Sequence, residues 1–559
     1  MESREDLESI LPYLPLLVRS SSLSWPSVAV EEALKAMAGG PDHSMVDTGE
    51  ALFIAITALR RLSPCLSSQP LASSASHGYA FFFDELMSEA ESAKWFGEVV
   101  PALANLLLRL PSLLEAHYQH ADYGLFNGKL KTGLRLLGSQ EPGTVVLSQE
   151  LIGALLGCSL FCLFPVSNRG VKHLPTINFD HLFASLYDSY NPNQENKIRC
   201  IVHYFERICS DMPVGIVSFE RKVLPLEGRP LCISYPNSKF WSNSVIPLCR
   251  VEVQNSGLIE DQSSEALEVD FANKYFGGGA LRRGCVQEEI RFMINPELIA
   301  GMLFLPSMAE NEAIEIIGAE RFSSYTGYAS SFRFSGDHVD KRDVDCFGRR
   351  KTRIIAIDAL CSPGMRQYKQ ECLLREINKA FCGFFDQSKY QQYERLFQEN
   401  VYCEAQLDQK LHETASTSGE TYGGKSVNQV IRNYEKNCQN MGHEHNIGIV
   451  TGNWGCGAFG GDPELKTMIQ WLAASQALRP FISYYTFNLE ALQNLDQVTR
   501  WILSHEWTVG DLSNMLDEYS CQKYKGQTNV GFLTWLLPSL SSHDVEMPDA
   551  EMPDLPNMP

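Results

Sequence analysis

The sequence predicts an α/β protein in which a sheet is flanked by helices and follows an all-helical N-terminal domain. Dense leucines recur at helical spacing in residues 103–114 and 151–164. From about residue 221 the pattern changes to short apolar runs separated by helical stretches. At 559 residues the chain is too long for one ordinary hydrophobic core. We therefore expect a helical accessory domain at 1–220, an α/β domain at 221–541 and a tail at 542–559.

The expected elements follow one another along the chain. The first 220 residues hold helices and a Ser- and Ala-rich loop at 67–77, and no catalytic constellation. Strands are predicted at 217–223, 267–273, 313–317, 354–359 and 447–450, and helices at 287–293, 375–385 and 463–476. Strands that alternate with helices build an α/β sandwich. Residues 406–427 read as a surface loop, and the acidic, proline-rich tail reads as disordered.

Composition narrows the class of protein. The net charge is −20 and the pI is near 5.2, so nonspecific binding of nucleic acid through a basic face is not expected. Sixteen cysteines without a C-x-x-C pair and a charged, acidic start predict a reduced protein of the nucleus or cytoplasm. We also expect the protein to be a monomer. The longest apolar run, 151–166, is short for a membrane span and contains Pro165. We expect no membrane partner.

The most informative stretch is a run of three glycines, Gly277-Gly278-Gly279, followed by Gln287-Glu288-Glu289. Glycines allow the backbone to approach a ligand closely, because no Cβ intervenes. Two adjacent carboxylates repel each other, which pushes one of them toward its protonated form. A protonated carboxylic acid beside a tight ligand-binding loop is suited to cleaving a glycosidic bond. Taken alone, the pattern is more often a plain glycine turn before an exposed helix start, where Glu is favoured by the helix dipole.

Neighbouring residues favour the first interpretation. Residues 267–273 alternate like a half-buried strand that ends in polar groups, and 287–293 reads as a short helix that Pro296 prevents from continuing simply. Ligands of open α/β sheets bind at the carboxyl ends of strands. We therefore expect four side chains to reach one crevice, namely Asp270, Asn273, Glu288 and Glu289.

A second glycine loop, Gly455-x-Gly457-x-x-Gly460, follows one predicted strand and precedes a helix. This spacing satisfies the dinucleotide fingerprint, a phosphate-cradling turn against a helix N-terminus. An NAD-dependent oxidoreductase is therefore an alternative. The loop lies near the end of the chain, and no acidic residue ends a second strand about 20 residues further on, as ribose recognition would require.

Several long motifs occur in order along the chain, at residues 269–273, Gly277-Gly278-Gly279, residues 287–298, 325–329, 452–462 and 485–487. Together they resemble the poly(ADP-ribose) glycohydrolase family of the animal and plant type, over roughly residues 170–525. The resemblance implies that 221–541 is a macrodomain-like catalytic domain, with a mixed sheet flanked by helices. It also implies exo-cleavage of ribose–ribose O-glycosidic bonds of the polymer on modified proteins, with release of ADP-ribose.

The resemblance implies roles for individual residues. Tyr328 and Phe487 would face the adenine, and Ile259 with Glu260 would contact its edge. Glu289 would be the general acid, and Glu288 would hold ribose hydroxyls and raise the pKa of Glu289. By this resemblance the catalytic residues would be Asp270, Glu288 and Glu289. The substrate-binding residues would be Ile259, Glu260, Asn273, Gly277, Gly278, Gly279, Gln287, Tyr325, Tyr328, Asn453, Gly457, Ala458, Phe459, Gly460, Gly461 and Phe487.

Within these roles, Asp270 and Asn273 would hold the ribose, and Gly278 and Gly279 would pass beside the diphosphate. The second loop would also bind the diphosphate, with Phe459 against it. No metal or cofactor is expected, because carboxylates do the proton work, and His443-Glu444-His445 reads as a polar turn. A macrodomain that binds ADP-ribose without cutting it is the non-enzymatic alternative, although binding alone gains nothing from a repulsive acid pair.

Overall fold

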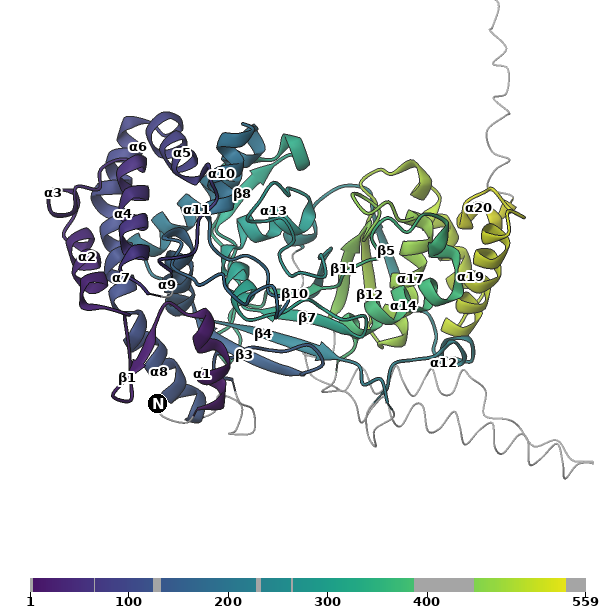
Figure 1. Ribbon diagram of the computed structural model, residues 1–559. Helices are drawn as coiled ribbons and strands as arrows, with labels where there is room; N and C mark the ends of the chain where they lie inside the picture. Colours follow the sequence, from purple (N-terminus) through teal and green to yellow (C-terminus); the bar gives the residue numbers. More distant parts are fainter. Residues whose placement is uncertain are drawn as a thin grey trace, which may run out of the picture.

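The protein is described by a computed structural model that covers residues 4–64, 66–123, 132–227, 233–262, 265–386 and 447–538 (Figure 1). The loop predicted at 406–427, the His443-Glu444-His445 turn and the tail predicted at 542–559 lie outside the described residues.

One eight-stranded mixed sheet forms the centre of the molecule, in the order β3-β4-β7-β10-β6-β11-β12-β5. The strands are β3 (Gly143–Ser148), β4 (Ile216–Val223), β5 (Arg250–Gln254), β6 (Ala266–Asp270), β7 (Glu312–Ile317), β10 (Arg353–Ala356), β11 (Gly448–Gly452) and β12 (Phe481–Tyr485). The five strands from β10 to β5 run parallel, whereas β3, β4 and β7 pair antiparallel with their neighbours. The predicted macrodomain-like mixed sheet is confirmed.

Helices cover both faces of the sheet, as Figure 1 shows. The main helices of the N-terminal region are α2 (Val28–Ala38), α4 (Gly49–Arg61), α7 (Val100–Leu108), α8 (Leu110–Tyr123), α9 (Gln149–Leu160), α10 (Asp180–Asp188) and α11 (Pro192–Ser210). Those that follow are α13 (Gln287–Ile294), α14 (Gln370–Phe384), α17 (Pro463–Gln476), α18 (Leu495–Ser504) and α19 (Val509–Tyr524). The predicted helix at 103–114 is two helices, because Pro111 cannot donate a backbone hydrogen bond and starts a new one.

The N-terminal region is not all helical. A short hairpin, β1 (Leu17–Arg19) with β2 (Ser22–Ser24), lies near its start, and β3 joins the central sheet beside β4. Strand β4 begins at Ile216, so residue 220 falls inside a strand of the sheet. Residues 143–148 are hard to predict as a strand, because they directly precede the strongly helical pattern of α9.

The hydrophobic core also crosses the predicted boundary. One continuous cluster of buried residues joins Leu103 of α7 and Phe205 of α11 to Phe219 of β4, Phe292 of α13 and Ile316 of β7. A second cluster lies between the other face of the sheet and helices α14, α17 and α19. The helical region therefore forms one layer of the catalytic fold, packed onto one face of its sheet.

Strand β6 is fully buried, which corrects the half-buried strand expected at 267–273. Leu267 and Val269 pack into the second core cluster. The alternate residue Glu268 is buried on the other face, where Arg291 (2.5 Å) and Arg342 (2.6 Å) neutralise it. The polar residue in this alternating strand therefore forms buried ion pairs and does not face solvent.

No single helix within the described ranges is long and apolar enough to cross a membrane. Only the segments 89–108 and 110–122 together reach that length and composition, and they meet at a bend of 51°.

Candidate active site

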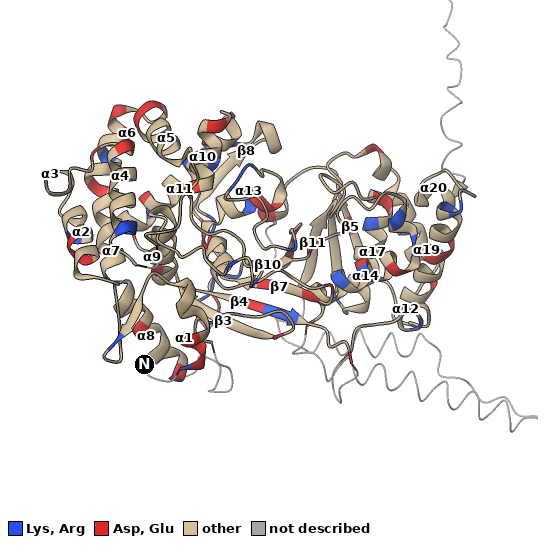
Figure 2. Cartoon of the chain, viewed as in Figure 1, with Lys and Arg blue, Asp and Glu red and all other residues tan. Residues whose placement is uncertain are grey.

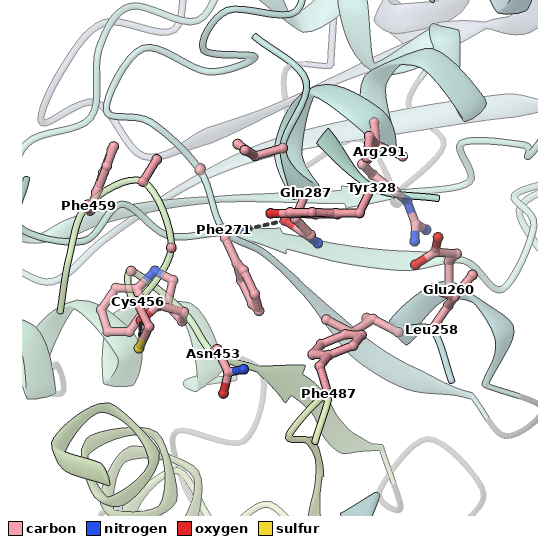
Figure 3. Close-up of a pocket in the computed structure, with 18 of the residues that line it drawn as sticks. Leu258, Glu260, Phe271, Gln287, Arg291, Tyr328, Asn453, Cys456, Phe459 and Phe487 are labelled. Atoms are coloured by element: carbon pink, nitrogen blue, oxygen red, sulfur yellow. Dashed lines mark hydrogen bonds between the residues drawn. The ribbon is translucent and has the colours of Figure 1, made fainter. Parts of the chain in front are cut away.

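A cavity of about 550 Å³ opens at the carboxyl ends of the parallel strands (Figure 3). The chain segments that follow β5, β6, β10, β11 and β12 all contribute to its wall, as expected for ligand sites of open α/β sheets. Helix α13 closes one side. The lining residues are Gly257, Leu258, Ile259, Glu260, Phe271, Ala272, Val286, Gln287, Ile290, Arg291, Tyr325, Gly327, Tyr328, Ala359, Asn453, Trp454, Gly455, Cys456, Gly457, Ala458, Phe459, Phe487 and Leu489.

The start of α13 is tied to the end of β6 by Gln287. Its side-chain oxygen accepts the N–H of Phe271 at 2.8 Å, and its amide donates to the carbonyl of Val269 at 3.1 Å. Figure 3 shows the first of these contacts beside the cavity. Because both ends of the amide are used on backbone, Gln287 fixes where the next two residues begin.

Four backbone N–H groups hold the adjacent carboxylates. Glu288 accepts from Asn273 at 2.8 Å and from Gly277 at 2.7 Å. Glu289 accepts from Gly279 and from Val286, each at 2.9 Å. Both side chains are buried, with 2% and 7% exposure. The glycine run therefore folds around the acid pair and supplies two of its four donors.

Glycine is required at the centre of this run. Gly278 has φ = +48°, and a Cβ there would lie 2.5 Å from Oε2 of Glu288 and 2.9 Å from Oε1 of Glu289. A Cβ at Gly284 would lie 2.5 Å from the same Glu289 oxygen. These distances are far inside van der Waals contact. The loop lacks side chains here because carboxylates occupy the space.

Burial and mutual repulsion change the proton affinity of this acid cluster. Burial, followed by the charges of Asp270 and Glu289, raises the pKa of Glu288 well above its usual range. Burial likewise raises the pKa of Asp270 to about 7, although the charge of Arg291 acts in the opposite direction. Neither carboxylate oxygen of Asp270 has a hydrogen-bond partner within the described part of the chain. The cluster can therefore hold a proton near neutral pH.

Two aromatic rings face each other across the cavity in Figure 3, namely Tyr328 and Phe487. They are about half exposed, at 53% and 47%. Exposed rings that border a cavity from opposite sides can stack on a flat base. Glu260 lies beside them, nearly buried, and accepts a hydrogen bond from the Tyr325 hydroxyl at 2.5 Å. Tyr325 therefore positions Glu260.

The second glycine loop connects β11 to α17. Among the described residues, the backbone N–H groups of Gly457, Ala458 and Phe459 have no partner, and all three residues line the cavity. The N-terminus of α17 is already occupied, because Asp462 accepts from Glu464 at 2.9 Å and Leu465 at 3.3 Å. The fingerprint is thus present between strand and helix, but the free donors belong to the loop and not to the helix.

A buried lysine, Lys466, packs against a residue of this second loop. The Lys466 ammonium lies 4.1 Å from the centre of the Trp454 ring and pairs with Glu376. Gly460 and Gly461 use their N–H groups on Gly457 and Gly455 carbonyls, at 3.0 and 2.9 Å. They shape the loop without lining the cavity.

Comparison with known proteins identifies the family. Residues 238–494 match the family profile described as poly(ADP-ribose) glycohydrolase, macro domain fold, and residues 87–221 match the profile of its helical domain. Over 556 residues the chain is 62% identical to poly(ADP-ribose) glycohydrolase 1 of Arabidopsis thaliana, covering 97% of this chain and 98% of that protein. The chain belongs to the poly(ADP-ribose) glycohydrolase family.

Further relatives agree. The chain is 55% identical to the probable poly(ADP-ribose) glycohydrolase 2 of Arabidopsis thaliana over 97% of its length and 100% of that protein. It is 34% identical over 296 residues to poly(ADP-ribose) glycohydrolase 1 of Caenorhabditis elegans, covering 51% of this chain and 30% of that protein. The expected enzyme class, a poly(ADP-ribose) glycohydrolase, is confirmed.

The predicted site residues divide into two groups in this glycohydrolase fold. Ten line the cavity, namely Ile259, Glu260, Gln287, Tyr325, Tyr328, Asn453, Gly457, Ala458, Phe459 and Phe487. Nine do not, namely Asp270, Asn273, Gly277, Gly278, Gly279, Glu288, Glu289, Gly460 and Gly461. Three of these nine residues use their backbone N–H groups inside the protein. Asn273 and Gly277 donate to Glu288, and Gly279 donates to Glu289, so these donors are not available to a ligand.

Sequence reasoning missed residues that shape the site. Arg291 lines the cavity and forms an ion pair with Glu268. Its position in the predicted helix, about one turn after Glu288, could have indicated that it lies near the site. Lys197 of α11 is fully buried and donates to the carbonyls of Arg282 at 2.7 Å and Gly284 at 2.6 Å. The helical region therefore holds the loop whose Gly279 N–H donates to Glu289. No local pattern marks a lysine on an amphipathic helix for such a contact.

Proposed function

We propose that this glycohydrolase is exo-acting: it cleaves the terminal ribose–ribose O-glycosidic bond of poly(ADP-ribose) by carboxylate acid–base catalysis and releases ADP-ribose. Family membership supports the substrate and the class of reaction. One observation carries the mechanism. An acid pair fastened by four backbone N–H groups lies directly behind a cavity with an aromatic end and a free-amide end.

The terminal ADP-ribose unit would extend along the cavity. The adenine lies between Tyr328 and Phe487, and its exocyclic amine donates to Glu260. The diphosphate accepts hydrogen bonds from the free N–H groups of residues 457–459, which suit an anion because the backbone donors need not be ordered on binding. Phe459 lies at the far end from Glu260 in Figure 3, where its ring would cover the diphosphate and adjoining ribose.

The outer ribose would then lie at the start of α13, near Asp270, Asn273 and the acid pair. As the C1″–O bond lengthens, the ribose gains oxocarbenium character. Glu289 donates its proton to the leaving ribose oxygen, which becomes the hydroxyl of the shortened polymer. The resulting carboxylate takes a proton from water, whose oxygen bonds to C1″ and yields ADP-ribose. Glu289 is thereby reprotonated for the next cycle.

Glu288 would hold the hydroxyls of the outer ribose and share the proton of the cluster. Burial and the charges of Asp270 and Glu289 raise the pKa of Glu288, which supports this role because interacting acids share their protons as a group. The expectation that Glu288 raises the pKa of Glu289 stays a prediction.

A non-catalytic reader of ADP-ribose is the second candidate, because both carboxylates lie behind the cavity wall and do not line it. An oxidoreductase has no comparable support: the fingerprint loop is present, but the family resemblance and the missing acidic strand end favour a glycohydrolase.

The deciding experiment incubates the purified protein with labelled poly(ADP-ribose), a chelator and no nicotinamide cofactor. Free ADP-ribose is the expected product from the first time point, with no oligomers preceding it. Intact but bound polymer would favour the reader. Cleavage that stops with chelator and returns with magnesium would contradict the two-carboxylate mechanism.

We further propose that the protein acts as a monomer in the nucleus or cytoplasm, on polymer carried by modified proteins, without nucleic acid or membrane. A net charge of −20 and the interspersed basic and acidic residues in the view of Figure 2 support a substrate held by backbone amides and not by a basic face.

A further inference from the structure

A small cavity of about 20 Å³ adjoins the Glu260 end of the active-site cavity, since Glu260 and Arg291 line both. Every residue that lines the small cavity is polar or charged. No apolar side chain packs against Glu260 from this cavity. On this side, Glu260 is therefore positioned by directed hydrogen bonds and ion pairs.

Arg342 makes two of these contacts with one guanidinium group. Its Nη2 donates to the backbone carbonyl of Glu260 at 2.7 Å, and its Nη1 lies 2.6 Å from Oε1 of Glu268. Glu260 belongs to the one-turn helix η4 (Ile259–Asp261), whereas Glu268 lies in the central strand β6. Because the guanidinium is planar and rigid, the two contacts together fix the spacing between the η4 turn and the strand.

The backbone of Arg342 is itself anchored at both of its polar atoms. Arg342 follows strand β9 (Arg333–Asp337), and its N–H donates to Oδ1 of Asp340 at 3.0 Å. Its carbonyl accepts from the Arg350 guanidinium at 3.1 Å. The side chain that reaches η4 therefore starts from a fixed point.

The Glu260 carboxylate has one oxygen in use and one available. Oε1 accepts from the Tyr325 hydroxyl at 2.5 Å, and Oε2 accepts no hydrogen bond from the described residues. Glu260 can therefore accept one hydrogen bond from a ligand in the cavity that it lines. The place of that acceptor depends on the backbone that Arg342 holds.

We propose that Arg342 is the positioning residue for base selection: it holds the η4 turn so that Glu260 accepts from the exocyclic amine of adenine and rejects a base without that amine. This proposal rests on the adenine contact proposed above and adds the residue that makes the contact selective. A hydrogen bond weakens steeply as its distance and angle depart from the preferred values. When the Arg342 contacts are lost, the η4 turn can shift, and the amine loses its acceptor while the base still stacks.

The test measures the binding of two ligands by calorimetry, namely ADP-ribose and its hypoxanthine analogue, in which an oxo group replaces the exocyclic amine. The wild type should bind ADP-ribose about tenfold more tightly, the scale of one hydrogen bond to a charged group. Arg342→Met should lower the affinity for ADP-ribose about fivefold and leave that for the analogue within about twofold, so that the preference falls to about twofold. Arg342→Lys keeps a positive charge beside Glu268 without the two-pronged contact, and should retain part of the preference.

Arg353→Met is the matched control. The Arg353 side chain of β10 is about as exposed as that of Arg342, at 19% against 23%, and it pairs with Glu265 at 2.9 Å. Arg353 lines neither cavity, so its variant should keep the full preference for ADP-ribose.

The ratio of the two affinities separates positioning from general support of the fold. Equal losses for both ligands in the Arg342 variants, or an unchanged preference, would overturn the proposal. If Arg342→Met does not fold, the partial loss of preference expected in Arg342→Lys decides. A wild type that binds both ligands equally would overturn the adenine contact of Glu260 on which the proposal rests.

Discussion

The two glycine loops of this protein use the same residue type in opposite ways. In the first loop, the N–H groups of Gly277 and Gly279 are given to the enzyme's own carboxylates. In the second, the N–H groups of residues 457–459 have no partner among the described residues, and all three residues line the cavity. A glycine run can thus preorganise catalytic side chains or leave donors ready for an anion, and only the hydrogen bonds tell which.

The largest expected effect is on the acid held by the first loop. Glu289→Gln should reduce turnover of poly(ADP-ribose) by about 10²–10⁴-fold, because glutamine cannot exchange a proton. ADP-ribose affinity, measured by calorimetry, should stay largely unchanged, since the second loop and the aromatic pair are intact.

Glu91→Gln is a control for the loss of a helix-capping carboxylate. Glu91 accepts the N–H of Ser88 at the start of its helix, as Glu289 accepts that of Val286, and it lies outside the cavity. Its variant should lose a little thermal stability and no activity. Near-normal turnover of folded Glu289→Gln would remove Glu289 from the mechanism.

The glycines themselves distinguish the two loops. Gly278→Ala should lower turnover by about tenfold or more, because the new methyl group meets both carboxylates and the residue has a positive φ. Gly457→Ala is the matched change in the second loop, where a Cβ has nothing within 4 Å and the N–H is kept. It should change turnover less than threefold. Similar losses in both variants would refute the contrast between the loops.

How far the sequence predicts this site follows from the same contrast. The order of strand, glycine run and Gln287-Glu288-Glu289 predicted α13 and its acid pair, and the fingerprint spacing predicted a loop between β11 and α17. Local sequence could not show that Gly277 and Gly279 point to carboxylates, because both kinds of loop need the same small residue.

The contribution of the N-terminal region was equally hidden. Strand β3 pairs with β4 some seventy residues later, and the Lys197 ammonium reaches carbonyls more than eighty residues away. Periodicity reports only which face of an element is buried, and says nothing of which distant segment covers that face. The fold class was therefore predictable from pattern, whereas the layer that supports the active-site loop was not.

A smaller effect is expected at the aromatic end of the cavity. Tyr328→Ala should weaken ADP-ribose binding by about 1 kcal/mol or more, because it removes one of two rings available to the adenine. Binding of ribose 5-phosphate, which has no base, should not change and serves as the control. Unchanged ADP-ribose affinity by calorimetry would show that Tyr328 only packs against the sheet.

The smallest expected effect is on the pH dependence of stability, through the buried carboxyl group of Asp270. The pKa of Asp270 is raised to about 7 by burial, so between about pH 4 and pH 7 the native state binds a proton that the unfolded state has released. Stability from this group therefore falls as pH rises through that window. Asp270→Asn removes the titration, and its melting temperature relative to wild type should be higher at pH 8 than at pH 5, by about 1 °C or more.

Asp345→Asn supplies a control of opposite sign. Burial acts to raise the pKa of Asp345, but the backbone N–H and guanidinium of Arg349 outweigh it and hold the pKa below its usual range. Ionised Asp345 therefore stabilises the fold above its unfolded pKa, and its variant should lose more stability at pH 8 than near pH 3. If Asp270→Asn showed the same direction as Asp345→Asn, Asp270 would be a stabilising ion-pair partner, and the cluster behind the first loop would hold no proton near neutral pH.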